Sequence, residues 1–166
     1  MGMRSIYLLS FSILASLVFA TAAFAILYAF SYSQSHGSYS LAGFAIGKVM
    51  LENNTWNVYV AKTLAQQEQG YMYQHSIGDC NGMGNCLGML FIMNGTQEIC
   101  MWMHNTPMPL HQYWIENNAI VYSYNAVPFS DKTICHMGNA VLETNRTIPV
   151  GTGFYVNRSW TQQSKA

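Results

Sequence analysis

Four polar side chains close together in the sequence are the first candidates for a functional site: His104, Asn105, Thr106 and His111. They lie in the stretch Ile99–His111, which begins like a strand and is then interrupted by two prolines, whose nitrogens cannot donate to a sheet. Polar groups at such a corner can hydrogen-bond a polar ligand or peptide. They can equally satisfy main-chain groups where the strand ends, and both interpretations stay open.

Methionine is unusually common in the same stretch, where Met101, Met103 and Met108 are three of the 11 methionines of the chain. Thioethers and imidazoles both suit copper(I), so a copper site made by His104, His111, Met101 and Met103 is an alternative interpretation. Methionine is also a common filler of small hydrophobic cores. The first expectation is therefore a protein without a metal or other cofactor.

Strand alternation predicts two different faces for this stretch. The predicted faces are Ile99, Met101 and Met103 on one side and Cys100, Trp102 and His104 on the other.

All four cysteines lie beyond the N-terminal part of the chain, and in an exported protein they would form disulfides. Cys80 and Cys86 enclose a short loop whose glycines allow it to close, which leaves Cys100 to pair with Cys135. The competing interpretation is metal ligation by thiolates. No CxxC pair is present, so zinc is not favoured.

The low charge of the chain limits its function classes. Its 166 residues include seven basic and seven acidic side chains, so the formal net charge of zero gives no indication of a nucleic-acid partner. Charged residues make up 8% of the chain, against about 25% in an average protein. No catalytic triad or Cys-His pair is recognisable by spacing, which favours a binding or structural role over an enzyme.

The apolar run Ile6–Phe30 contains no charged residue. At about 1.5 Å per residue it is long enough to cross a hydrocarbon core of about 30 Å. The alternative is a cleaved signal sequence, since Ala20-Thr21-Ala22 and Ala23-Phe24-Ala25 both resemble cleavage sites. Arg4 precedes the run and favours a domain that faces outside. We therefore expect a single-pass protein of the cell membrane, with the membrane as its partner through residues 6–30.

The remaining chain divides into a polar linker at residues 31–43, a β-rich extracytoplasmic domain at residues 44–158 and a tail at residues 159–166. A capping box at Thr63 and Gln66 predicts one short helix from Leu64 to about Tyr71, closed by Gly70. Strands separated by turns are predicted around this helix. They are Phe44–Leu51, Trp56–Lys62, Met89–Asn94, Gln112–Glu116, Ala119–Ala126, Ala140–Thr144 and Gly153–Asn157, with a long loop from Val127 to Gly138.

This pattern predicts a mainly β fold, a small sandwich or barrel-like domain with one short helix, preceded by a single N-terminal transmembrane helix. The strand Met89–Asn94 is expected to end at Asn94-Gly95, because that dipeptide is typical of a turn.

Several short motifs follow one another between Trp56 and Glu143. They are Val60-Ala61-Lys62-Thr63, Gln69-Gly70-Tyr71-Met72, Gly88-Met89-Leu90-Phe91, Trp102-Met103-His104-Asn105-Thr106 with Pro109-Leu110, and Val141-Leu142-Glu143. In this order and spacing the segment resembles the domain of unknown function 192 family. The resemblance implies a compact β-rich domain, often exported or anchored, with no assigned reaction.

The chain departs from the family pattern at three positions. The family usually has Arg at the place of Gln74, Lys at His104 and Asp at His111, so three charges are replaced here. A mechanism that needs a carboxylate after the Pro-Leu pair could not work unchanged. Because two imidazoles are mostly uncharged near neutral pH, we expect these replacements to leave a neutral hydrogen-bonding pocket for a polar ligand or protein partner. The residues of this predicted pocket are Gln74, Met103, His104, Asn105, Thr106 and His111.

Four sequons occur at predicted turns, at Asn53, Asn94, Asn145 and Asn157, and surface glycans are expected in a host that glycosylates exported proteins. The sequence as a whole favours a membrane-anchored binding or structural module at the cell surface. The alternative is a copper-binding or redox accessory protein.

Overall fold

The computed structural model describes residues 21–28 and 40–157 of the chain. They belong to two separate units, and residues 21–28, in the first unit, are helical. No helix within these described ranges is both long enough and apolar enough to cross a membrane. The described residues exclude most of the predicted anchor Ile6–Phe30 and most of the predicted linker. They also exclude the whole predicted tail.

The domain at residues 40–157 is built on one seven-stranded sheet with the order β5-β4-β6-β3-β2-β1-β7. The elements are η1 (Leu41–Gly43), β1 (Ala45–Leu51), β2 (Asn54–Ala61), α2 (Leu64–Gln69), β3 (Cys86–Met101), β4 (Leu110–Glu116), β5 (Ala119–Ala126), β6 (Ile134–Thr144) and β7 (Phe154–Val156).

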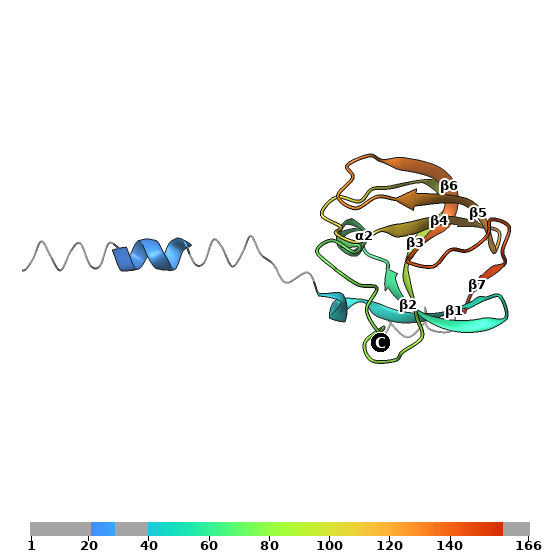
Figure 1. Cartoon of the computed structure of the whole chain (residues 1–166), viewed down its shortest axis with the longest axis horizontal. Coiled ribbons are helices and arrows are strands. Elements are labelled where there is room, and N and C mark those ends of the chain that lie inside the picture. The colour runs from blue at the N-terminus through green and yellow to red at the C-terminus, as the bar shows by residue number, and fades with distance from the viewer. Residues whose placement is uncertain (1–20, 29–39, 158–166) are drawn as a thin grey trace, which may run out of the picture. The chain divides into compact units, whose positions relative to one another are not determined.

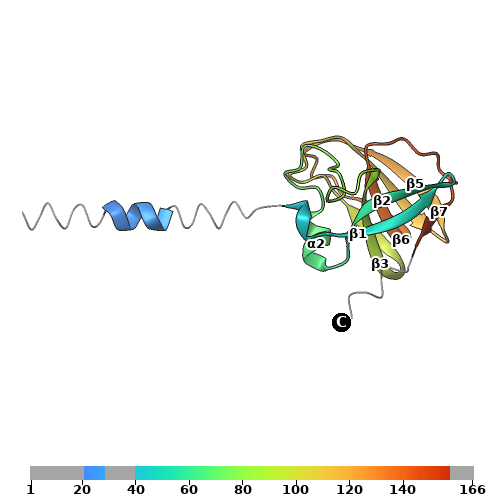
Figure 2. The ribbon, with the colours of Figure 1, turned by 90° about the horizontal axis from the view of Figure 1, so that it is seen from below.

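The sheet is curled into a half-barrel (Figure 1). The edge strand β5 meets the segment just before the other edge strand, β7. Ala119 forms a bridge with Gly153, and Ile120 N donates a hydrogen bond of 3.0 Å to Thr152 O. Figure 2 shows β5 and β7 at the same end of the strands, with α2 at the opposite end. The predicted mainly β fold with one short helix is confirmed, in a barrel-like form rather than as a two-sheet sandwich.

Two tight hairpins confirm the turn predictions. β1 and β2 are joined at Glu52 and Asn53, with φ of 51° and 63°, and β4 and β5 are joined at Asn117 and Asn118, with φ of 51° and 61°. Two consecutive positive φ angles match the right-handed twist of the strands, and asparagine tolerates them well.

Helix α2 also begins where the sequence predicts. Thr63 Oγ1 accepts a hydrogen bond of 3.2 Å from Gln66 N, and Gln66 Oε1 accepts one of 3.2 Å from Thr63 N, which is the predicted capping box. The helix ends at Gln69, earlier than expected, because Gly70 takes a positive φ of 45° and Tyr71 turns into the core.

The prediction that a strand ends at Asn94-Gly95 is wrong. β3 continues through this dipeptide as an irregularity between Ile92 and Gln97, and its second half pairs with β6 from Gln97↔Gly138 to Met101↔Ile134. For the same reason β6 starts at Ile134, inside the predicted loop. An Asn-Gly pair permits a turn, but a long partner strand can absorb it as a bulge.

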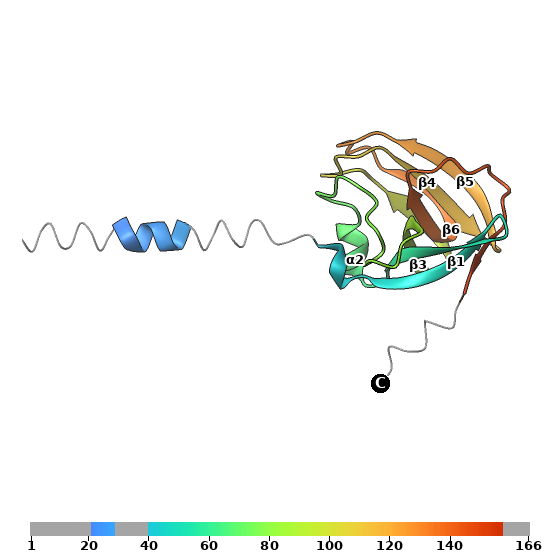
Figure 3. The same cartoon turned by 60° about the horizontal axis from the view of Figure 1, so that its bottom comes forward.

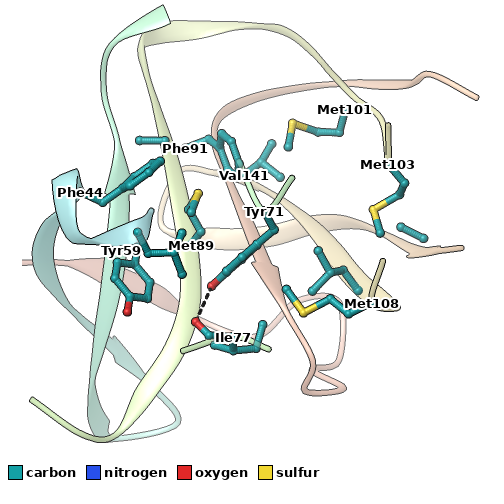
Figure 4. Packing of buried hydrophobic residues seen from close by; sticks show 14 of the residues in the cluster. Phe44, Tyr59, Tyr71, Ile77, Met89, Phe91, Met101, Met103, Met108 and Val141 are labelled. Atoms are coloured by element: carbon teal, nitrogen blue, oxygen red, sulfur yellow. Dashed lines mark hydrogen bonds between the residues drawn. The ribbon is translucent and has the colours of Figure 1, made fainter. Parts of the chain in front are cut away.

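Each face of the sheet buries its own hydrophobic cluster. One cluster includes Val58, Leu90 and Leu142, and Phe154 of β7 packs into it. The other cluster lies on the opposite face, beneath the loops that follow α2 and β3, and its members include Tyr71, Met89, Met101, Met103 and Met108. Figure 3 shows the loops at the α2 end of the strands, and Figure 4 shows the side chains of the second cluster.

Both predicted disulfides are present. Cys80–Cys86 closes a loop with a sequence separation of 6 residues and a Cα–Cα distance of 5.3 Å. Cys100 and Cys135 face each other directly across β3 and β6, with a sequence separation of 35 and a Cα–Cα distance of 4.0 Å. The second bond therefore fixes the register of the two central strands.

The two disulfides should differ in their effect on stability. Cys100–Cys135 has a sequence separation of 35 residues, and its removal as a Cys→Ala pair should lower the free energy of unfolding by about 4 kcal/mol. Removal of Cys80–Cys86, with a separation of 6, should lower it by about 2 kcal/mol. The longer loop has the larger effect because it restricts the unfolded chain more. Urea unfolding of the two double variants against the parent measures both values. An equal or reversed order would contradict the chain-entropy explanation.

Candidate functional site

A small cavity of about 20 Å³ lies on the methionine-rich face of the sheet. Its walls come from the end of α2 and the residues that follow it, from β3, from the corner after β3 and from β6. The lining residues are Gln67, Glu68, Gln69, Gly70, Tyr71, Met72, Phe91, Met101, Trp102, His104, Thr106 and Glu143. Segments far apart in the sequence therefore meet at one point.

Glu143 is the carboxyl group of this cavity, and its side chain is buried, with only 3% of the residue exposed. It lies opposite Gln112 across β6 and β4, and Gln112 Nε2 donates a hydrogen bond of 2.9 Å to Glu143 Oε1. Gln112 Nε2 also lies 3.7 Å from Met103 Sδ. Within residues 21–28 and 40–157, the second carboxyl oxygen of Glu143 accepts no hydrogen bond.

Burial changes the titration of Glu143. Loss of solvation raises the pKa of its carboxyl group from 4.5 to about 7, and the hydrogen bond from Gln112 opposes this only in part. At neutral pH the group therefore exchanges between its charged and neutral forms. Groups with such a pKa are suited to binding a charged partner or to moving protons, although a purely structural role can produce the same shift.

Tyr71 is the aromatic neighbour of this carboxyl group. Its ring is buried among Met89, Met101 and Val141, and its hydroxyl donates to Ile77 O at 3.3 Å (Figure 4). Burial raises the pKa of Tyr71, and the negative charges of Glu143 and then of Tyr59 raise it further. The phenol is therefore a neutral wall of the site.

The predicted polar corner reaches the cavity through His104 and Thr106. Thr106 N donates to Met103 O at 3.0 Å and Thr106 Oγ1 donates to His104 O at 3.3 Å, so the threonine closes the turn itself. Asn105 takes a positive φ of 53°, and its carbonyl accepts from Tyr73 N at 2.8 Å. The structural role considered for this corner is thus observed for Thr106 and for the main chain of Asn105, while His104 and Thr106 line the cavity.

His104 is held at the mouth of the cavity by two contacts. Its Nδ1 lies 2.6 Å from Asp131 Oδ1, and its ring stacks on Trp102 with a centroid distance of 4.9 Å. The predicted alternation is observed, since Met101 and Met103 are buried while Trp102 is 45% exposed.

His111 is not brought to the same place as His104. It lies on the other face of β4, where its Nδ1 is 2.7 Å from Asn125 Oδ1, its Nε2 is 3.4 Å from Thr147 Oγ1 and its ring stacks near Tyr113. The side chain of Gln74 donates to Met72 O at 3.4 Å beside the cavity, outside its lining. Met103 is buried beneath the site, against Gln112.

The alternative copper ligands are also separated by the sheet, because Met101 and Met103 are buried on one face and His111 lies on the other. In the part of the chain that the structure describes, no group of three or more His, Cys, Asp or Glu side chains could hold a metal ion. The four sequon residues Asn53, Asn94, Asn145 and Asn157 are all exposed, and their glycosylation stays a prediction.

Sequence reasoning included Glu143 in a motif but missed it as a site residue, and it missed Gln112 entirely. The signal for Glu143 was available: it follows Ala140-Val141-Leu142, so an acidic side chain ends an apolar run. Gln112 similarly precedes Tyr113 and Trp114 in a strand of large apolar residues. Polar residues inside such runs are informative because burial without a partner is costly.

Comparison with known proteins identifies the family. The profile of DUF192, described as an "Uncharacterized ACR", matches residues 48–153. The chain belongs to this family. No curated protein matches the sequence.

Two solved crystal structures are similar to the DUF192 domain. A proposed transcription regulator from Sinorhizobium meliloti 1021 is 26% identical, with a TM-score of 0.58 over 68% of this chain and 95% of that chain. A protein of unknown function from Novosphingobium aromaticivorans is 24% identical, with a TM-score of 0.53 over 67% of this chain and 84% of that chain. The similarity to the Novosphingobium protein concerns the fold alone.

Several residues of the family motifs line the cavity, among them Gly70, Phe91 and Glu143. Met89 of β3 pairs with Glu143 of β6, and a Cβ atom at Gly88 would lie 1.9 Å from the carbonyl oxygen of Glu143. Glycine at position 88 is therefore required for the close approach of the two strands.

The raised pKa of Glu143 has a consequence for stability. Between pH 4.5 and 7 the unfolded chain loses this proton while the folded chain keeps it, so the free energy of unfolding should fall by about 3 kcal/mol across that window and stay level above it. Below pH 4.5 both states are protonated and the group contributes no slope. Glu143→Gln should lose this fall, as measured by urea unfolding at a series of pH values.

Glu98→Gln is the matched control, because Glu98 is an exposed residue on the neighbouring strand β3. It should keep the parental pH dependence. A parental slope that persists in Glu143→Gln would show that another group causes it.

Proposed function

We propose that this chain is a membrane-anchored extracytoplasmic module that binds a small polar group in the Glu143 cavity. The observation that carries this proposal is the second carboxyl oxygen of Glu143, which accepts no hydrogen bond from the described residues although the side chain is buried. A group that donates a hydrogen bond to this oxygen would offset part of the cost of its burial.

The size of the cavity fits such a ligand group. Its volume of about 20 Å³ exceeds the roughly 10–15 Å³ that one water molecule needs, so one small polar head fits and a whole organic ligand does not. The remainder of a ligand would lie outside, over Trp102 and His104 at the mouth. A permanently bound water is the competing explanation, and it predicts no ligand.

Location outside the cytoplasm is supported by three independent features. The run Ile6–Phe30 is long and apolar and follows Arg4, both disulfides are formed, and only 8% of residues are charged. The description of the Sinorhizobium protein as a proposed transcription regulator is not extended to this chain, because its zero formal charge offers no electrostatic footprint for nucleic acid.

Binding can be tested on protein purified from its own membrane. Native mass spectrometry of the full chain should show a bound small molecule at about one per chain, which Glu143→Gln loses and Glu98→Gln keeps. His104→Ala should weaken retention because it opens the mouth, whereas His111→Ala should not, since His111 lies on the opposite face.

Three other outcomes would contradict the proposal. A parent protein that carries no ligand supports a bound water in the cavity. Equal retention in Glu143→Gln places the ligand elsewhere. A stoichiometric copper adduct that His104→Ala abolishes would favour the copper-binding alternative.

The topology has its own test. Protease added to intact cells should remove the domain at residues 44–158, because the run Ile6–Phe30 would hold it outside the membrane. A cytoplasmic marker protein should survive as the control. Protection of the domain would refute export, and release of a chain that begins near Ser31 would show a cleaved signal sequence instead of an anchor.

A further inference from the structure

We propose that the group bound by Glu143 is a primary ammonium, so that the ligand is an amine or a lysine side chain. This inference rests on the proposed binding function and specifies the chemistry of the same site. It follows from the charges around the cavity, the nature of its walls and its size.

The charges around the cavity favour a cation. Its lining includes two carboxyl groups, Glu68 and Glu143, and no lysine or arginine. Among the lining residues only His104 has an ionisable nitrogen, and its Nδ1 already contacts Asp131. A buried carboxylate without a cationic partner is costly, and a bound ammonium would supply the missing charge together with N–H donors.

The walls of the cavity also suit a cation. Three aromatic side chains, Tyr71, Phe91 and Trp102, line it, and aromatic ring faces attract an ammonium. Gln67, Glu68 and Gln69, at the C-terminal end of α2, also line the cavity. The C-terminal end of a helix carries partial negative charge, which adds to the attraction.

The volume separates classes of cation. About 20 Å³ holds one water-sized group, and the –NH₃⁺ head of a primary amine has that size. A quaternary ammonium is larger and has no N–H group to donate to Glu143, so it should not take this place. The alkyl part of the amine would leave through the mouth, where Trp102 is 45% exposed.

The test uses the full chain in detergent, labelled with ¹³C at its glutamate carboxyl carbons, and methylammonium chloride as the probe. The Glu143 resonance should shift saturably, and affinity should be about tenfold higher at pH 8 than at pH 6, since the carboxyl group is largely ionised only above about pH 7. The ratio of the affinities at pH 8 and pH 6 should be the same in His104→Gln, which would show that the pH dependence comes from Glu143 and not from the imidazole of His104.

Matched probes and variants decide the assignment. Tetramethylammonium is larger and has no N–H group, and methanol is uncharged. Both should bind at least tenfold more weakly than methylammonium. Glu143→Gln should abolish the binding that Glu98→Gln retains. The pH comparison in the parent protein needs no substitution, so it stands even if Glu143→Gln does not fold.

Nα-acetyl-lysine amide and n-butylamine identify the source of the ammonium. Tighter binding of the lysine derivative supports a protein partner, and equal binding supports a free amine. Methanol or potassium that binds as well as methylammonium would overturn the ammonium assignment while leaving a binding site. No binding of any probe, together with no ligand in native mass spectrometry, would overturn the proposed function as well.

Discussion

The pairing of β3 with β6 is the constraint on which the rest of the domain depends. β3 runs from Cys86 to Met101 and joins the β2 side of the sheet to the β4 side through β6. Its first half needs Gly88 to approach the backbone of Glu143, and its second half is locked by Cys100–Cys135. The corner after β3 therefore starts from a fixed position, which brings it over the carboxyl group that β6 supplies.

The two faces of the sheet explain why a charged group can be buried in so small a domain. Because both faces carry hydrophobic clusters, the central strands are largely shielded from water, and side chains that alternate along β6 enter one cluster or the other. Leu142 points to one face and Glu143 to the opposite one, where Gln112 offers a single neutral donor. The register of the strands thus buries this carboxyl group with one hydrogen bond, from Gln112. The second carboxyl oxygen is the group to which we propose that a ligand binds.

The corner shows that structural and functional roles can coexist in the same residues. Thr106 and Asn105 satisfy main-chain groups of the turn, and this keeps His104 stacked on Trp102 at the mouth of the cavity. A turn that saturates its own hydrogen bonds is a rigid support for a neighbouring site. A rigid support of this kind reduces the ordering cost that a ligand would have to offset.

Local rules were sufficient for much of the fold. Asn53 and Asn117 mark hairpins because asparagine tolerates a positive φ, and Thr63 with Gln66 marks the start of α2 because the two residues satisfy each other's main-chain groups. The short Gly-rich spacing of Cys80 and Cys86 predicted the first disulfide, and Cys100 and Cys135 were then the two cysteines left to form the second.

Tertiary structure decided what depends on partners distant in the sequence. Asn94-Gly95 lies in an irregularity of β3 instead of ending the strand, because β6 pairs with β3 both before and after this dipeptide. His104 and His111 are seven positions apart in the sequence, yet they do not meet. The corner after β3 brings His104 to the cavity, whereas the alternation of side chains along β4 puts His111 on the face of Tyr113. Glu143 became the centre of the site because the end of α2, β3 and the corner at residues 102–106 converge on it, and no local pattern encodes that convergence.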